Sequence, residues 1–186
     1  MNDAIKLKGL FISLDYVYNI TPPKGKITLL SWSGPTQLVL CLNNEEGCIA
    51  SIGLVPDSDS ITINSKTNPD YEGKKYNTLL RCAVMFLVPL LSSEFKFIKS
   101  EAKNPISAYL LLQKFDGFIP DNDYNEDITA FLSDKSTDVR DYKILLHEYK
   151  LSLGSNSFGI EVYCPVNEDT VTKNETAFYV YLGNIT

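Results

Sequence analysis

The sequence contains little that would build a metal centre or a histidine-based catalytic site. His147 is the only histidine in 186 residues, so a histidine-rich zinc site is excluded, and a Cys–His nucleophilic pair would have to use this residue alone. The four cysteines form no Cys-x-x-Cys pair, and most of them lie in apolar segments, where free thiols behave as small hydrophobic side chains. We therefore expect no metal site and a reducing, cytoplasmic location.

Long apolar runs and an excess of positive charge are also missing. The most apolar run, residues 79–91, contains Arg81 and Pro89 and is shorter than the roughly 20 residues that span a bilayer. The first residues lack the basic, apolar and small-residue order of a signal peptide. The formal net charge of -6 disfavours long-range attraction to nucleic acid or to an anionic membrane, so we expect neither partner.

The composition is that of a folded domain. Hydrophobic residues make up 44% of the chain and charged residues 22%, close to the average for globular proteins, so intrinsic disorder is not expected. Because the length also fits one domain, we predict a single domain over residues 1–186.

Turn signals and hydrophobic periodicity predict strands first and helices later. Short runs rich in β-branched and aromatic residues are separated by turns containing Pro, Gly or Asn, as in an antiparallel meander. The pair Asn104-Pro105 is typical of a helix start. The predicted strands are residues 10–18, 27–32, 37–42, 48–54, 60–64, 95–99, 158–164 and 176–182, and the predicted helices are residues 78–91 (ending near Pro89), 104–115 and 142–151. This order predicts an α+β or mixed α/β fold, with helices packed on a largely antiparallel sheet.

Residues 60–80 form the stretch that most suggests a binding site. A strand leads through a turn containing Gly73 into the start of a buried helix, where free amides and the helix dipole favour a phosphate. Lys74 and Lys75 add positive charge at that point. A solvated turn that binds nothing fits these residues equally well.

Residues 68–80, Asn-Pro-Asp-Tyr-Glu-Gly-Lys-Lys-Tyr-Asn-Thr-Leu-Leu, resemble the acyl-CoA pyrophosphate loop of the GNAT superfamily of N-acetyltransferases, usually written P-x-x-[QR]-G-x-G-x-[GA]-x-x-L. Further along the chain, residues 100–107 are similar to the second CoA element of the family, in which an asparagine after a strand opens the next helix. The resemblance implies a GNAT-like fold and acetyl-CoA or CoA as the cofactor. The residues that it implies for cofactor binding are Ser65, Thr67, Gly73, Lys74, Lys75, Tyr76, Asn77, Thr78, Asn104 and Ser107.

The loop departs from the family pattern at three positions. Glu72 stands at the Gln or Arg position, Lys75 replaces a glycine of G-x-G, and Asn77 replaces the Gly or Ala. Backbone amides bind the phosphates in such a loop, so these changes need not abolish binding. Asparagine tolerates a positive φ better than most residues, and the charge of Lys75 opposes that of Glu72.

The family's catalytic tyrosine has no counterpart at the expected place. Counting seven residues from Asn104 gives Leu111, and counting back from Gly117 gives Gln113. Tyr109 lies about 200° around the helix from Leu111, so we assign it to packing. The general acid and the general base stay unassigned.

In function, the resemblance implies an acetyl-CoA-dependent acyltransferase that acetylates a primary amine of a small molecule or a protein. The altered loop and the missing tyrosine leave an alternative open, a non-catalytic GNAT-fold module for CoA binding or protein interaction. Residues 119–154 are longer than the family's usual link at this point, which predicts an insertion that caps the acceptor site, forms a partner surface or has no role. A homodimer is also left open.

Overall fold

The computed structural model describes residues 26–31, 38–44, 47–91, 94–115, 117–121, 126–152 and 159–185. The chain forms two compact units, Met1–Ile98 with Val166–Thr186, and Lys99–Pro165. The strand expected at residues 10–18 lies outside the described residues. Among the described helices, none combines the length and the apolar composition that crossing a bilayer requires.

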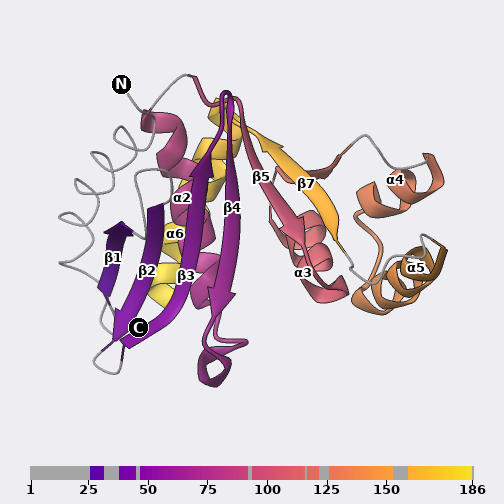
Figure 1. Ribbon diagram of the computed structural model, residues 1–186, viewed down its shortest axis with the longest axis horizontal. Helices are drawn as coiled ribbons and strands as arrows, with labels where there is room; N and C mark the ends of the chain where they lie inside the picture. Colours follow the sequence, from indigo (N-terminus) through magenta and orange to yellow (C-terminus); the bar gives the residue numbers. More distant parts are fainter. Residues whose placement is uncertain are drawn as a thin grey trace. The chain divides into compact units, whose positions relative to one another are not determined.

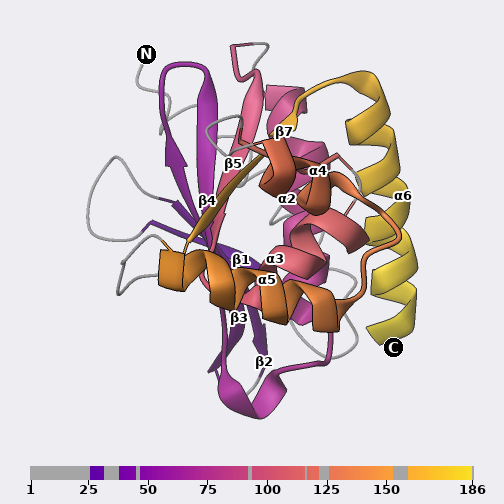
Figure 2. The same ribbon diagram turned by 90° about the vertical axis from the view of Figure 1, so that its right-hand side faces the viewer.

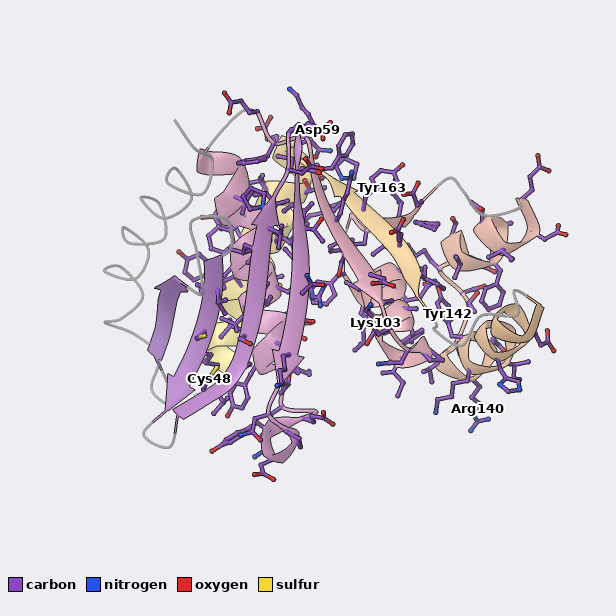
Figure 3. The ribbon with its side chains drawn as sticks, viewed as in Figure 1. Cys48, Asp59, Lys103, Arg140, Tyr142 and Tyr163 are labelled. Carbon is purple, nitrogen blue, oxygen red and sulfur yellow. The ribbon has the colours of Figure 1, made fainter. Side chains whose placement is uncertain are left out.

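The first unit is built on an antiparallel meander of four strands (Figure 1). In chain order and in sheet order these are β1 (Lys26–Ser31), β2 (Leu38–Asn44), β3 (Gly47–Pro56) and β4 (Ser60–Thr67). The strand order continues from β4 to β5 (Phe97–Ala102), whose first two residues belong to this unit. At the turn between β3 and β4, labelled by Asp59 in Figure 3, the Asp59 carbonyl accepts hydrogen bonds from the amides of Lys96 and Phe97, at 2.6 and 3.3 Å.

Two helices cover one face of this meander (Figures 1 and 2). α2 (Tyr76–Leu91) packs on β2, β3 and β4, and α6 (Glu168–Ile185) packs on α2. The apolar side chains of α2 are buried on the sheet side and on the α6 side, which confirms the prediction of a helix enclosed on most sides. The helix ends at Leu91, two residues after Pro89, as the predicted bounds of residues 78–91 have it.

α6 replaces the strand that was predicted at residues 176–182, and this prediction was wrong. Asn167 and Thr170 cap the helix reciprocally: each backbone amide donates to the side-chain oxygen of the other, at 3.1 and 3.0 Å. Thr170, Asn174 and Phe178 are buried at a spacing of four residues. The Phe178 ring lies 5.1 Å from the ring of Phe86 on α2. Packing between the two helices therefore outweighs the strand propensity of the aromatic and β-branched residues in this segment.

The second unit carries the rest of β5, two more strands and three helices (Figure 2). Its strands follow the order β5, β7 and β6, with β7 (Ile160–Pro165) antiparallel to β6 (Ile119–Pro120). α3 (Pro105–Tyr109) continues into a π-helical turn, η2 (Leu110–Lys114), and packs against α5 (Val139–Ser152), while α4 (Glu126–Ser133) packs against β6. The short strand β6 was not predicted.

The predicted fold class is confirmed. The structure is mixed α/β, with a largely antiparallel sheet flanked by helices, and most of the predicted elements appear within a few residues of their expected bounds. The segment predicted to be an insertion, residues 119–154, contains β6, α4 and α5.

Candidate functional site

The loop from β4 to α2 has a left-handed backbone at two positions. After a single turn of 3-10 helix, η1 (Pro69–Tyr71), the φ angles are 76° at Gly73 and 65° at Lys75. These are the two positions at which the GNAT pattern has the glycines of G-x-G. A side chain beyond glycine costs about 1–2 kcal/mol in this conformation, so Lys75 has a backbone that glycine would adopt without strain.

This loop leaves the N-terminus of α2 open to an anion. The Lys75 carbonyl accepts from the Leu79 amide at 3.0 Å, which makes Lys75 the N-cap residue. The amides of Tyr76, Asn77 and Thr78 therefore have no acceptor within the helix. The first turn of α2 carries no acidic residue, so its dipole is not offset by a local carboxylate. Such an end favours a phosphate.

The two lysines of the loop lie beside aromatic rings of the same unit. The Lys74 ammonium is 5.0 Å from the ring centre of Tyr71, and the Lys75 ammonium is 5.8 Å from that of Tyr181 on α6. Both side chains are exposed, so both charges stay in solvent near the loop. Glu72 is exposed as well, and its amide closes η1 by donating to the Pro69 carbonyl.

The polar end of β4 is hydrogen-bonded to two side chains of α2. The Asn77 side-chain nitrogen donates to Thr67 Oγ1 at 3.2 Å and to the Lys66 carbonyl at 3.0 Å. Four residues further along α2, an Arg81 guanidinium nitrogen donates to Ser65 Oγ at 2.7 Å. Ser65 and Thr67 share one face of β4, and Asn77 and Arg81 share one face of α2. We call these four residues the β4–α2 ladder.

The sequence did not single out Arg81 as a site residue. It lies in the core of α2 with 8% of its surface exposed, and burial lowers the pKa of its guanidinium to about 10, which leaves the group charged at neutral pH. In the sequence it is only an interruption of an apolar run. The usable signal was its spacing of four residues from Asn77, which puts both polar groups on the same side of a buried helix.

The helix start predicted at Asn104-Pro105 is confirmed. Asn104 is the N-cap residue of α3, its side-chain oxygen accepts from the Ser107 amide at 2.9 Å, and Pro105 occupies the first helical turn. Asn104 and Ser107 belong to the second unit, whereas the other eight predicted cofactor residues belong to the first. Their contact with a cofactor stays a prediction.

The positions at which the family pattern would put a catalytic tyrosine serve the core of the second unit. Leu111 is buried, and the Gln113 side-chain nitrogen donates to Tyr142 Oη at 2.8 Å and to the Asp134 carbonyl at 2.9 Å. Tyr142, labelled in Figure 3, is itself buried and donates to the Leu132 carbonyl. Burial raises the pKa of this phenol.

Tyr109 packs as predicted. Its ring meets that of Tyr142 edge to face, with centroids 5.5 Å apart and planes at 79°, and the Lys114 ammonium lies 5.4 Å from its ring centre. The contact accounts for a tyrosine at this position on α3, and the absence of a catalytic role stays a prediction.

Comparison with known proteins finds similarity in structure only. No family model matches the sequence, and no curated protein matches it. Among solved structures, the chain is similar to the ribosomal-protein-S18-alanine N-acetyltransferase of Escherichia coli, with a TM-score of 0.47 and 15% identity over 84% of this chain and 89% of that one.

Two further solved structures are similar to the chain. A Bacillus anthracis protein assigned as a streptothricin acetyltransferase, solved in complex with acetyl coenzyme A, has a TM-score of 0.46 and 14% identity over 73% of this chain and 66% of that one. A Desulfovibrio desulfuricans protein assigned to the GNAT family has a TM-score of 0.44 and 9% identity over 72% and 71%. At such TM-scores and identities the likeness carries no argument about function, which has to be argued from the residues of this chain.

Proposed function

We propose that the loop between β4 and α2 binds the diphosphate of acetyl-CoA, and that the protein transfers the acetyl group to a primary amine. The observation that carries the proposal is the left-handed backbone at Lys75. Strained backbone of this kind persists at sites where the conformation itself is used. Here it keeps the amides of the loop and of the first turn of α2 turned toward one anion site.

In this proposal the residues act mainly through the backbone. The amides from Gly73 to Thr78 hold the diphosphate, with Lys74, Lys75 and Tyr76 lining the loop and Asn77 fixing it to β4. The pantetheine arm extends along Ser65 and Thr67. The resemblance adds Asn104 and Ser107 to the same cofactor.

Acetyl transfer from a thioester to an amine needs few catalytic side chains. The amine nitrogen attacks the thioester carbonyl, a base or water removes a proton from the ammonium, and the C–S bond breaks to release CoA as thiolate, which takes up a proton. Holding the two reactants adjacent and stabilising the oxyanion with a backbone N–H supply most of the acceleration. The base that accepts the proton is unassigned.

A second candidate is a non-catalytic module that binds CoA or a partner protein. The observation that favours it is that Leu111 is buried in the core and that Gln113 is half-buried and bonded to Tyr142, because neither residue can protonate a departing thiolate. Turnover separates an enzyme from a module that binds CoA without catalysis, and the absence of CoA binding identifies a module that binds only a partner protein.

The test measures release of free CoA from acetyl-CoA by the purified protein with a panel of primary amines, together with calorimetric binding of CoA. The variants are Gly73→Asp and the matched control Gly47→Asp. Both glycines have a positive φ and open space around an added Cβ, but Gly47 lies in the β2–β3 hairpin. We expect turnover with at least one amine, lost in Gly73→Asp and kept in Gly47→Asp.

Two other outcomes are decisive. Binding of CoA without release in the presence of any amine would favour the second candidate. No binding of CoA at millimolar concentration would exclude the acetyltransferase and the CoA-binding module, and would leave only a module that binds a partner protein.

A further inference from the structure

In the β4–α2 ladder, the hydroxyl oxygens of Ser65 and Thr67 can only accept hydrogen bonds from the side chains of α2. A guanidinium has only donors, so Ser65 Oγ must be the acceptor in its 2.7 Å bond with Arg81. The Asn77 side-chain nitrogen also bonds two backbone carbonyls, those of Lys66 at 3.0 Å and Ser51 at 3.4 Å, which identifies it as the donor end of the amide. In its 3.2 Å contact with this nitrogen, Thr67 Oγ1 can therefore only accept. The proton of each hydroxyl has to point to another group.

We infer that Arg81 and Asn77 are positioning residues that orient the hydroxyls of Ser65 and Thr67 as donors to the amide carbonyls of the pantetheine arm. The inference rests on the proposed function, because it concerns the arm that continues from the diphosphate. Two strand residues on one face lie about 7 Å apart, and the arm carries two amide carbonyls in sequence. The site should therefore prefer ligands that place hydrogen-bond acceptors along β4, because a ligand without them leaves the hydroxyl protons of Ser65 and Thr67 unpaired.

The surroundings of the ladder support this use. From Ser60 to Ile63 every residue of β4 is buried except the half-buried Thr62, and Asn64 to Lys66 are exposed. The strand therefore passes from the core to the surface where the ladder begins. A hydrogen bond from a charged donor is stronger than a neutral one, and it polarises the O–H group that accepts it. Burying a charged guanidinium costs free energy. The hydrogen bond from Arg81 to a hydroxyl at the exposed end of β4 therefore indicates a role for Arg81 beyond packing.

The experiment compares two probes, CoA and 3′-phospho-ADP, which has the nucleotide and diphosphate of CoA but no pantetheine arm. Calorimetry measures both affinities for the wild type and for Ser65→Ala, Arg81→Met and the double variant. Asn64→Ala is the matched control, since Asn64 is exposed on the opposite face of β4. Arg81→Lys, which restores a charged donor, tests for rescue.

We expect Ser65→Ala to weaken CoA binding about fivefold, the value of one hydrogen bond, and to leave 3′-phospho-ADP unchanged. Adding Ser65→Ala to Arg81→Met should cause no further loss, and Arg81→Lys should recover part of it. Asn64→Ala should change neither affinity. Ser65→Ala alone tests the inference if the Arg81 variants fail to fold.

Three results would overturn the inference, and they differ in what else they affect. Unchanged CoA affinity in Ser65→Ala, with both probes bound by the wild type, refutes the orientation of the hydroxyls and leaves the proposed function intact. An equal loss for both probes shows a structural effect of the ladder and refutes it as well. Failure of the wild type to bind either probe refutes the proposed function and the inference together.

Discussion

Replacing Lys75 tests the conformation on which the proposed site depends. Its φ of 65° is unstrained for glycine and strained for residues that have a Cβ, including alanine. We therefore compare Lys75→Gly with Lys75→Ala, because both remove the charge and the contact with Tyr181. The two variants differ only in the Cβ methyl group, which restricts the backbone.

The expected difference in stability combines two opposing effects. Glycine relieves strain of about 1–2 kcal/mol in the folded state. It also gives the unfolded chain more freedom than alanine does, which costs about 0.5–1 kcal/mol. Because the relief of strain outweighs the cost in chain entropy, Lys75→Gly should be more stable than Lys75→Ala by about 1 kcal/mol, or roughly 2–4 °C in Tm.

Urea denaturation of both variants measures this difference, with Lys143 as the matched control position. Lys143 is exposed on α5, an ordinary helix, where glycine should be less stable than alanine by about 1 kcal/mol. The prediction is thus a change of sign between the two sites. A Lys75→Gly variant less stable than Lys75→Ala would refute the left-handed loop.

Three further predictions concern charge, thiols and the packed tyrosine. Glu72→Gln should strengthen CoA binding by about 1 kcal/mol or less in low-salt calorimetry, with a smaller gain at high salt; equal affinities at low salt would show that Glu72 faces away from the diphosphate. Near neutral pH a thiol reagent should modify the exposed Cys48 and spare Cys41 and Cys82, since burial raises the pKa of both thiols to about 12; peptide mass spectrometry would contradict this by finding either buried thiol modified before unfolding. Tyr109→Phe should leave acetyl transfer nearly unchanged; a loss of about a hundredfold in kcat, with CoA affinity and stability intact, would make Tyr109 the general acid.

The start of α3 and the β1–β4 meander could be predicted from the sequence, because capping and turn residues close together in the chain determine them. Asn104-Pro105 specifies a cap and a first helical position within three residues, so the start of α3 was predictable. The β1–β4 meander was predictable for the same reason, because its turns are short and their residues explicit.

α6 was missed because two local patterns conflict in residues 167–182. A run of aromatic and β-branched residues toward the end of the segment favours a strand, while the Asn167–Thr170 cap and the acidic residues that follow Asn167 favour a helix. Packing of Phe178 against Phe86 resolves the conflict in favour of the helix, and this contact joins residues far apart in the sequence. A periodicity argument cannot include it.

The candidate site also has features that the sequence predicts and features that it does not. Gly73 and the start of the helix after it were predictable from the motif, whereas the strained backbone of Lys75 was not, because lysine rarely adopts a positive φ. The pairing of Arg81 with Ser65 depends on how α2 lies on β4, which no local pattern encodes.

The most direct test of the central claim is an amide NMR titration of the protein with CoA. If the loop binds the diphosphate through its backbone, the largest shifts should fall on the amides of residues 73–78, with smaller shifts at Ser65 and Thr67. Gly47, which shares the positive φ but lies in another hairpin, should not shift. Binding that shifts amides elsewhere and leaves residues 73–78 unchanged would contradict the account.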